Sequence, residues 1–415
     1  MIHKVQGGNY SGTIVVPASK SDGQRALLAA ALANGESELI NLGSSLDESH
    51  MKKAIQELGA QVEVKGDSTR IQGVHSFPAE VTLNAGESGL GSRLLTSVCA
   101  AHDGVFNVVG EGSLVQRPQT FFEEHLPLLG VSVDTTNGAF PIRVKGPMTG
   151  AEIDVDGSFS SQFLSGLLMA LPLVDGDSVL NVHSLKSKPY VDMTCATLKA
   201  FGIEIERNGP DCFAIRGNQS YVPCRYETDA DWSSASYWLA AAAMGHEIQM
   251  TGLRQNSLQA DKAMLTALQS AGCEIIAENS AIRVDGRNRT PFEFDATDCP
   301  DLFPSLVAFA ASIDGESTIH GVDRLAGKES NRGLTLQSQY RCLGVRIELA
   351  GDVMKVKANG RIDGGEVDSC NDHRIAMSLA IAGMFADGEV VIHGAEVVAK
   401  SYPDFWNHLN SLSKL

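Results

Sequence analysis

The feature that most constrains the fold is an internal repeat of roughly 70 residues. Five segments, such as ELGAQVEV and AFGIEIER, share a helix end, a glycine and a short alternating strand; their glycines are Gly59, Gly130, Gly202, Gly272 and Gly344, at intervals of 71, 72, 70 and 72 residues. A second glycine, between an Ala/Leu-rich stretch and a strand, recurs at Gly35, Gly104, Gly176, Gly245, Gly315 and Gly388. Regular self-similarity indicates repeated supersecondary units, so the chain is predicted to contain six copies of one unit.

Each copy combines two kinds of helix with short strands. The first helix is apolar on nearly all sides, as in RALLAAALA and SYWLAAAAMG, and a helix of that kind is buried. The second helix, as in MKKAIQEL, has a polar face and is expected on the outside. Alternation such as VEV or IEI indicates half-buried strands, and the glycines suit left-handed helix C-caps. This order predicts an α/β fold of βαβαββ-type units.

Composition and charge exclude several classes of protein. A chain of 415 residues is too long for one core and is expected to form two or three domains. The net charge of -17 argues against nucleic acid and anionic membrane as partners, because the averaged field repels polyanions. The eight cysteines have neither paired nor zinc-site spacing, which fits reduced thiols and no metal. Without a leader or a membrane-length apolar stretch, a cytoplasmic protein is expected.

Polar residues recur where the apolar helices are predicted to begin. The corresponding starts are Ser19-Lys20-Ser21, Glu87-Ser88-Gly89, Ser160-Ser161-Gln162, Ser233-Ser234, Pro300-Asp301 and Asp372-His373-Arg374. Helix N-termini attract anions through unpaired N–H groups and the helix dipole. If these ends converge, they form one anion-binding cleft. The alternative for any single Ser or Asp is an ordinary N-cap.

Cations recur at matching points of the repeat. The helix starts supply Lys20, Arg25, Arg93 and Arg374, and the loops before the outer helices supply Arg117, Lys186, Lys188, Arg324, Lys328, Arg332 and Lys400. Any one of these could be a solvated surface charge, but repetition at one phase of the unit indicates a polyanionic ligand. Arginine suits phosphate and carboxylate because its planar fork makes two bonds at once.

Two carboxylates accompany these cations as candidates for acid and base catalysis, Asp301 and Glu329. The alternative for Glu329 is an ion pair with a neighbouring Lys or Arg. No Walker A loop, dinucleotide fingerprint or metalloprotease helix occurs. The residues alone therefore predict an enzyme or binder of small phosphorylated, carboxylated metabolites, with no metal or nucleotide cofactor.

Several segments, taken together, resemble one family. They are PASKSDGQRALL, QRPQ, DGSFSSQFL, SKPYVDMT, PDLFPSL, GKESNR, NDHRIAMSLAI and AKSYPDFW. In this order they span essentially the whole chain and strongly resemble the 5-enolpyruvylshikimate-3-phosphate synthases, the 3-phosphoshikimate 1-carboxyvinyltransferases of the shikimate pathway. Each segment is short, but their joint occurrence is highly specific.

The resemblance implies two similar domains of three repeats each, an inverse α/β barrel arrangement with buried helices and outer sheets. One domain is expected over residues 20–228 and the other over 1–19 with 229–415, with the active site in the cleft between them and a hinge near Lys20 and Asp229. The implied substrates are phosphoenolpyruvate and shikimate 3-phosphate, without a cofactor, and a monomer is expected. The 5-hydroxyl of shikimate 3-phosphate would add to C2 of phosphoenolpyruvate as C3 gains a proton, after which phosphate leaves.

The resemblance also implies roles for individual residues. Shikimate 3-phosphate would be bound by Lys20, Ser21, Arg25, Ser160, Ser161, Gln162, Ser187, Tyr190, Asp301 and Lys328. Phosphoenolpyruvate would be bound by Lys20, Gly89, Arg117, Gln162, Arg332, Arg374 and Lys400. In catalysis, Glu329 would exchange the proton at C3, and Asp301, helped by Lys20, would act on the substrate hydroxyl.

The chain departs from the family pattern in the glycine loop. The family usually has NSGT or NAGT there, whereas this chain has Glu87-Ser88-Gly89-Leu90. A carboxylate beside an anionic substrate is unfavourable unless it is paired or protonated, so Arg93 or another cation is the expected partner of Glu87. Asn331 also stands where the family commonly has Asp, and Arg324 falls where some members have a ring-binding Asn. These changes leave the main cation set intact.

Two other functions are compatible with parts of the pattern. UDP-N-acetylglucosamine enolpyruvyl transferases have a similar fold and the same donor, but they generally carry a reactive Cys or Asp in the loop that corresponds to residues 112–117, which has neither. A non-catalytic anion-binding relative is supported by Glu87 and Leu90. Retention of Lys20, Asp301 and Glu329 counts against it.

Overall fold

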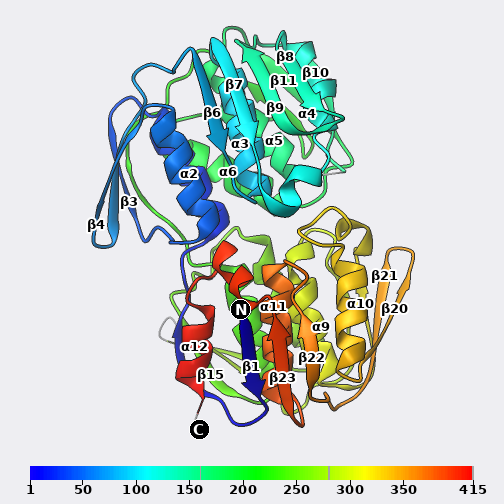
Figure 1. The fold of residues 1–415 in the computed structure, drawn as a ribbon. Coiled ribbons are helices and arrows are strands. Elements are labelled where there is room, and N and C mark those ends of the chain that lie inside the picture. Colours follow the sequence, from blue (N-terminus) through cyan, green and yellow to red (C-terminus); the bar gives the residue numbers. More distant parts are fainter. Residues whose placement is uncertain (159, 279–280, 414–415) are drawn as a thin grey trace. The chain divides into compact units, whose positions relative to one another are not determined.

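The computed structural model describes residues 1–158, 160–278 and 281–413. The chain forms two compact units, one of Met1–Pro17 with Ala230–Leu415 and one of Ala18–Asp229 (Figure 1). Each unit holds three small sheets. We refer to them as unit 1 and unit 2 in that order.

Unit 2 contains three four-stranded sheets. The first sheet has the spatial order β14 (Arg225–Glu227), β3 (Glu36–Ile40), β5 (Ser68–Gln72) and β4 (Gln61–Lys65). The second has the order β6 (Glu80–Asn84), β7 (Gly104–Val109), β9 (Ala139–Gly146) and β8 (Ser132–Thr136). The third has the order β10 (Glu152–Asp156), β11 (Ser178–His183), β13 (Cys212–Ile215) and β12 (Ile205–Arg207).

Unit 1 contains two four-stranded sheets and one of three strands. They are β2 (Ser11–Val15), β15 (Glu247–Thr251), β17 (Ala281–Asp285) and β16 (Glu274–Glu278); β18 (Glu293–Asp295), β19 (Asp314–His320), β21 (Val353–Asn359) and β20 (Arg346–Ala350); and β22 (Gly365–Asp368), β23 (Glu389–His393) and β1 (Ile2–Gln6).

All six sheets follow one pairing rule. The first two strands are parallel, as β6 is to β7, and the third is antiparallel to the second, as β9 is to β7. A parallel pair requires a crossover, and in four of the six sheets an apolar helix supplies it, as α3 does between β6 and β7. In the last sheet the N-terminal strand β1 takes the third position, antiparallel to β23. The predicted α/β class and βαβαββ order are therefore confirmed, with β1 completing the sixth unit.

The apolar helices are buried as predicted. They are α1 (Lys20–Leu32), α3 (Gly89–Ala100) and α5 (Ser161–Ala170) in unit 2, and α7 (Trp232–Ala243), α9 (Phe303–Ala311) and α11 (His373–Phe385) in unit 1. Every residue of α3 is buried, and β7 and β9 cover it (Figure 1). Such helices are held by burial of apolar area on all sides, about 25 cal/mol per Å².

The second helices have an exposed polar face. They are α2 (Leu46–Glu57), α4 (Thr120–His125), α6 (Lys188–Ala200), α8 (Met264–Ser270), α10 (Arg332–Cys342) and α12 (Phe405–Leu412). The chain also contains short 3₁₀ turns, namely η1 (Gly112–Gln116), η2 (Leu126–Leu129), η3 (Leu171–Leu173), η4 (Ala260–Ala263), η5 (Pro300–Leu302), η6 (Val322–Arg324) and η7 (Ala395–Lys400). Within the described residues, no helix is both long and apolar enough to span a bilayer.

Two strands are exchanged between the repeats where the chain passes from one unit to the other. β2 precedes α1 in sequence but pairs with β15, and β14 precedes α7 but pairs with β3. In unit 2, the N–H of Ser19 donates to the carbonyl oxygen of Asp229 at 2.7 Å. The buried Asp22 accepts from the N–H of Asp229 at 2.9 Å, which anchors this segment to α1.

Glycines explain how strand and helix approach each other closely. The glycines after the outer helices, at positions 59, 130, 202, 272 and 344, all have positive φ, as expected for left-handed caps, and so do those of the second marker except Gly388. Another glycine ends the third strand or directly follows it, and lies against the end of the buried helix. An added Cβ would lie 1.7 to 2.4 Å from a helix carbonyl oxygen at Gly7, Gly73, Gly146 and Gly286.

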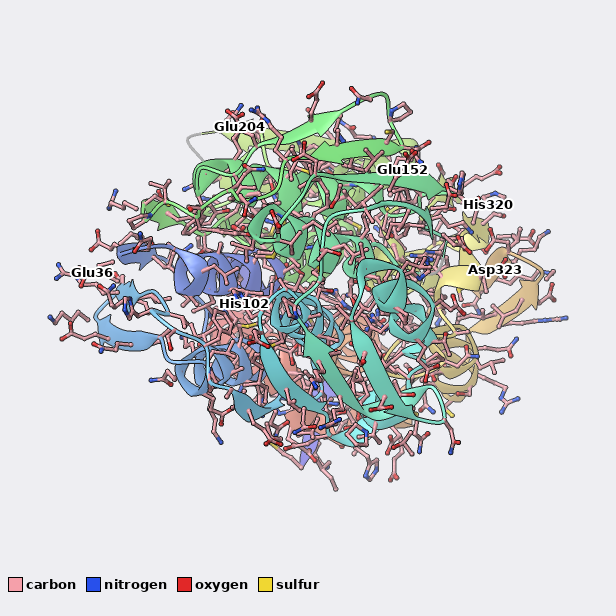
Figure 2. All side chains as sticks on the ribbon, turned by 90° about the horizontal axis from the view of Figure 1, so that it is seen from above. Glu36, His102, Glu152, Glu204, His320 and Asp323 are labelled. Carbon is pink, nitrogen blue, oxygen red and sulfur yellow. The ribbon has the colours of Figure 1, made fainter. Side chains whose placement is uncertain are left out.

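The excess negative charge lies on the outer surface. Glu36 on β3, Glu152 on β10 and Glu204 beside β12 are exposed, and Figure 2 shows their side chains pointing away from the ribbon. His102, by contrast, stacks on Phe77 with ring centroids 3.6 Å apart, and burial lowers its pKa to about 4. The negative net charge of the chain is therefore compatible with cations gathered at the helix starts.

Candidate active site

The serines at the starts of the unit 2 helices act as N-caps. Ser19 accepts from the N–H of Asp22 at 3.4 Å and Ser160 from the N–H of Gln162 at 3.3 Å. Ser88 accepts from the N–H of Gly91 at 3.0 Å. The three predicted helix starts are therefore confirmed, and the capping alternative holds for these hydroxyl groups.

The starts in unit 1 differ from the prediction in two places. The N-cap of α7 is Asp231, which accepts from the N–H groups of Ser233 and Ser234, so the predicted start was too late. Asp301 lies in the 3₁₀ turn η5 and caps no helix, because α9 begins at Phe303. Pro304 in the first turn of α9 suits a helix start there. This leaves the carboxylate of Asp301 available to side chains.

Arg25 draws together three helices of unit 2. Its side chain is buried, and its Nε donates to Oγ1 of Thr194 on α6 at 2.8 Å. Its Nη1 donates to the carbonyl oxygen of Ser21 at 2.7 Å. Its Nη2 donates to that of Tyr190 on α6 at 3.3 Å and to Oγ of Ser165 on α5 at 3.4 Å. Burial lowers the pKa of Arg25 to about 10, against the pull of Asp22. The predicted residues Ser21, Arg25 and Tyr190 therefore lie together.

A second cluster surrounds the start of α3. A Cβ at Gly89 would lie 3.0 Å from Nη1 of Arg117, 3.5 Å from Nη1 of Arg93 and 3.5 Å from Oε1 of Gln162. Arg93 donates to Gln162 and lies over the ring of Phe163, 4.5 Å from its centroid. Two arginines at a helix N-terminus form an anion-attracting surface, and a side chain at position 89 would press against Arg117. Arg93 was expected as a partner of Glu87 and not as a substrate ligand, and the contacts described for it here are with Gln162 and Phe163.

The remaining predicted residues of unit 2 lie at helix starts. Lys20 opens α1, and its Nζ lies 2.9 Å from Oδ2 of Asp47. Ser161 is the first residue of α5 and is buried. Ser187 precedes α6 with φ of +56°, in the left-handed region. Lys20 and Ser161 lie at the polar ends of apolar helices, whereas Ser187 precedes the amphipathic α6.

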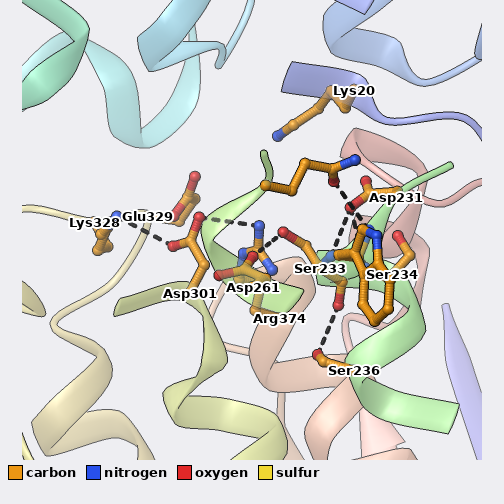
Figure 3. A network of polar contacts seen from close by, with 12 residues as sticks. Lys20, Asp231, Ser233, Ser234, Ser236, Asp261, Asp301, Lys328, Glu329 and Arg374 are labelled. Carbon is orange, nitrogen blue, oxygen red and sulfur yellow. Dashed lines mark hydrogen bonds and ion pairs between the residues drawn. The ribbon is translucent and has the colours of Figure 1, made fainter. Parts of the chain in front are cut away.

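Asp301 is the centre of the charged cluster in unit 1. It accepts from Nζ of Lys328 at 3.1 Å, Nη1 of Arg332 at 2.7 Å and Nη2 of Arg374 at 3.1 Å; Figure 3 shows the bonds from Lys328 and Arg374. Burial raises its pKa, but Arg374, Lys328 and Arg332 outweigh burial and hold it well below its ordinary value. Asp301 is therefore ionised at neutral pH.

Arg332 joins three carboxylates, those of Asp301, Glu329 and Asp372. Its side chain is 1% exposed, and its Nε donates to Oδ2 of Asp372 at 2.8 Å. Its Nη2 also donates to Glu329, so the ion-pair alternative for Glu329 is what this structure contains. Burial lowers the pKa of Arg332, but Asp372, Glu329 and Asp301 more than reverse the effect. Asp372, which also caps α11, was missed as a site residue because capping accounted for it.

Asp261 lies in the same cluster without having been predicted. It comes from η4, is 1% exposed and accepts from the hydroxyl of Ser233 on α7 (Figure 3). Burial raises its pKa to about 7, Asp301 adds to the rise and Arg374 opposes it. The local sequence QADKAM carries no sign of this role, because burial arises from the packing of separate elements.

The other predicted cations are distributed unevenly. Lys400 is buried and donates to the carbonyl oxygen of Asn371 at 2.9 Å, at the start of α11. Lys188 lies 3.5 Å from Asp211, and both side chains are exposed, so it is a surface charge. Across the described ranges, no group of three or more His, Cys, Asp or Glu side chains is arranged to hold a metal ion.

Comparisons with known proteins agree over nearly the whole chain. Residues 5–409 match the family model for EPSP synthase (3-phosphoshikimate 1-carboxyvinyltransferase). The chain is 34% identical over 424 residues to the 3-phosphoshikimate 1-carboxyvinyltransferase of Clostridioides difficile, covering 99% of this chain and 97% of the relative. The enzyme of that name from Clostridium acetobutylicum is 35% identical over 407 residues, with 97% and 95% covered.

Two solved structures share the fold. The EPSP synthase of Acinetobacter baumannii aligns with a TM-score of 0.82 and 25% identity, covering 99% of this chain and 98% of that one. The enolpyruvyl transferase NikO of Streptomyces tendae aligns with a TM-score of 0.80 and 19% identity, covering 99% and 97%. At that identity the second likeness concerns the fold alone.

Proposed function

Because this chain belongs to the EPSP synthase (3-phosphoshikimate 1-carboxyvinyltransferase) family, we propose that it transfers the enolpyruvyl group of phosphoenolpyruvate to the 5-hydroxyl of shikimate 3-phosphate. The products are 5-enolpyruvylshikimate 3-phosphate and phosphate, within the shikimate pathway to chorismate and the aromatic amino acids. The observation that carries the proposal is agreement with curated relatives over nearly the full length of both chains. Fold alone would not carry it, because one fold hosts several activities.

We assign shikimate 3-phosphate chiefly to the Arg25 cluster. A phosphate ester would be bound by Arg25 and the hydroxyl of Ser21, with Ser160, Ser161, Gln162, Ser187 and Tyr190 around the ring and Lys20, Asp301 and Lys328 completing the set. In support, Arg25 already contacts the backbone of Ser21 and Tyr190. A buried guanidinium aligned by three helices loses little freedom when it binds an anion.

We assign phosphoenolpyruvate to Arg117, Gln162 and Gly89 of unit 2, with Lys20, Arg332, Arg374 and Lys400. Two anionic groups on one small molecule require several cations, and the Gly89 cluster supplies two arginines. Arg332 and Arg374 are bonded to carboxylates in this structure. Binding therefore exchanges part of these internal bonds for bonds to the substrate.

The proposed chemistry follows from the charges. Addition of the hydroxyl builds positive character at C2 of phosphoenolpyruvate while a proton moves to C3, and Glu329 exchanges that proton. Asp301, helped by Lys20, acts on the 5-hydroxyl. A carboxylate surrounded by three cations is a weak base. Anionic substrates that draw those cations away raise its pKa, so its basicity increases when the substrates are bound. The arginines and lysines also stabilise the departing phosphate.

The proposal extends to the behaviour of the whole protein. Two domains, of residues 20–228 and of residues 1–19 with 229–415, close over the substrates, with the hinge near Lys20 and Asp229. Closure excludes water from the intermediate. The enzyme acts as a cytoplasmic monomer without a cofactor.

A phosphate-release assay tests this function directly. Release is expected only when phosphoenolpyruvate and shikimate 3-phosphate are both present. Release with UDP-N-acetylglucosamine in place of shikimate 3-phosphate would select the other enolpyruvyl transferase activity. Tight binding of both substrates without release would identify a non-catalytic relative.

A further inference from the structure

Two loops of unit 2 are bonded to each other beside the start of α3. One loop, residues 85–88, follows β6 and leads into α3, and the other, residues 110–117, follows β7 and contains the 3₁₀ turn η1. The N–H of Glu111 donates to the carbonyl oxygen of Gly86 at 2.7 Å, and that of Ala85 to Val109 at 3.0 Å. The two loops therefore form one structural element, which carries both Gly89 and Arg117 at its edges.

Glu87 makes a side-chain bond between these loops. Its Oε2 accepts from the N–H of Ser113 at 3.0 Å and from the hydroxyl of Ser113 at 3.3 Å. The carboxylate lies against Gly112, where φ is +51° and an added Cβ would lie 2.3 Å from Oε2. Only glycine fits both the conformation and the space. The turn is therefore built around this carboxylate.

Ser113 connects Glu87 to Arg117. A hydroxyl has one proton, and an ionised carboxylate can only accept. The proton of Ser113 therefore points to Glu87, which leaves a lone pair of the same oxygen for Nη2 of Arg117 at 3.2 Å. Arg117 is buried, and its Nη1 would lie 3.0 Å from a Cβ at Gly89. The chain of bonds orients the guanidinium over the N-terminus of α3.

We propose that Glu87 is a positioning residue for the enolpyruvyl donor: through Ser113 it holds Arg117 in place at the α3 N-terminus before phosphoenolpyruvate binds. The inference rests on the proposed function, because it takes phosphoenolpyruvate as the ligand of Arg117. It also accounts for a carboxylate in a loop beside an anionic substrate. Glu87 repels the donor, but fixing Arg117 removes an ordering cost from binding, and the second effect is the larger.

Steady-state phosphate release by five variants of the full chain tests the proposal. E87Q removes the charge but keeps an amide oxygen that accepts from Ser113, and its KM for phosphoenolpyruvate is expected to stay within about threefold of wild type. E87A and S113A each break the hydrogen bonds that connect Glu87 to Arg117 through Ser113, so KM for phosphoenolpyruvate is expected to rise roughly tenfold. KM for shikimate 3-phosphate should stay within about twofold. E111Q is the matched control: Glu111 lies in the same turn, is exposed and bonds Asn84 instead, and this variant should behave as wild type.

The E87A/S113A double variant shows whether the two residues act as one unit. Its KM for phosphoenolpyruvate should be no higher than that of the worse single variant, because both substitutions break the same chain. The proposal would be refuted if the rise in KM of the double variant equalled the product of the two single rises, because the two residues would then act independently. So would an unchanged or lower KM in E87A and S113A, because repulsion would then dominate. If E87A fails to fold by circular dichroism, S113A decides alone. If the wild-type protein releases no phosphate, the proposed function is contradicted. If the wild-type protein turns over and the variants have the same KM for phosphoenolpyruvate, only this inference is contradicted.

Discussion

Replacement of Asp261 by Asn is expected to stabilise unit 1 increasingly as pH rises. The pKa of Asp261 is raised by burial from 3.8 to about 7. Between these values the folded chain holds a proton that the unfolded chain has released. The contribution of Asp261 to the free energy of unfolding of the wild-type protein is therefore fully present below about pH 3.8. It is lost by about 1.4 kcal/mol per pH unit as the pH rises toward 7. Asn cannot ionise, but its side-chain oxygen can still accept from Ser233.

The magnitude follows from the same two pKa values. The variant should be more stable than wild type by about 2 kcal/mol at pH 5 and by about 4 kcal/mol at pH 8. Asp231, Asp301 and Arg374 face Asp261 and are the same in both proteins, so their own titration largely cancels in the difference. A difference of this size corresponds to a shift of the urea midpoint by roughly 1 M or more at pH 8.

Urea unfolding from pH 5 to pH 8, followed by tryptophan fluorescence, measures this difference. Trp232, Trp238 and Trp406 all belong to unit 1, so the signal reports the unit that contains Asp261. Asp295→Asn in the same unit is the control: Asp295 is exposed and its pKa is lowered by bonds from Thr297, so its replacement should give no gain at pH 8. Wild-type and D261N midpoints that stay a constant distance apart from pH 5 to pH 8 would refute a raised pKa at Asp261.

Three further predictions concern turnover, substrate binding and packing. Glu329→Gln should lower kcat about a hundredfold or more in the phosphate-release assay while both KM values stay within severalfold, and an unaltered kcat would remove Glu329 from proton transfer. Arg25→Ala should raise KM for shikimate 3-phosphate at least about tenfold; a defect confined to phosphoenolpyruvate would contradict the assignment. Gly286→Ala should destabilise unit 1 by about 1–3 kcal/mol in urea, because its Cβ would lie 1.9 Å from the carbonyl oxygen of Ala243. Gly8→Ala, with no atom within 4 Å of the added Cβ, is its control, and equal losses would show that steric contact is not the cause.

Local patterns predicted those parts of the fold that depend on neighbours in sequence. The apolar helices, the alternating strands and the left-handed glycines such as Gly130 and Gly202 were correct because period and backbone conformation are properties of short segments. The starts predicted at Ser233 and Asp301 were off by one or two residues, because Asp231 caps α7 and α9 begins at Phe303 with Pro304 in its first turn. Residues such as Arg25 and Arg374 stood out because they recur at one phase of the repeat.

The sequence by itself determined the six-unit α/β architecture, the charge types gathered at the helix starts and the family to which the chain belongs. Only the tertiary structure revealed the contacts between residues distant in the chain: Arg332 with Asp301 and Asp372, Asp261 with Ser233, and Glu87 with Ser113. The physical reason is that burial and hydrogen bonding depend on how separate elements pack. The pKa of Asp261 and the orientation of Arg117 are therefore products of packing that no local pattern encodes.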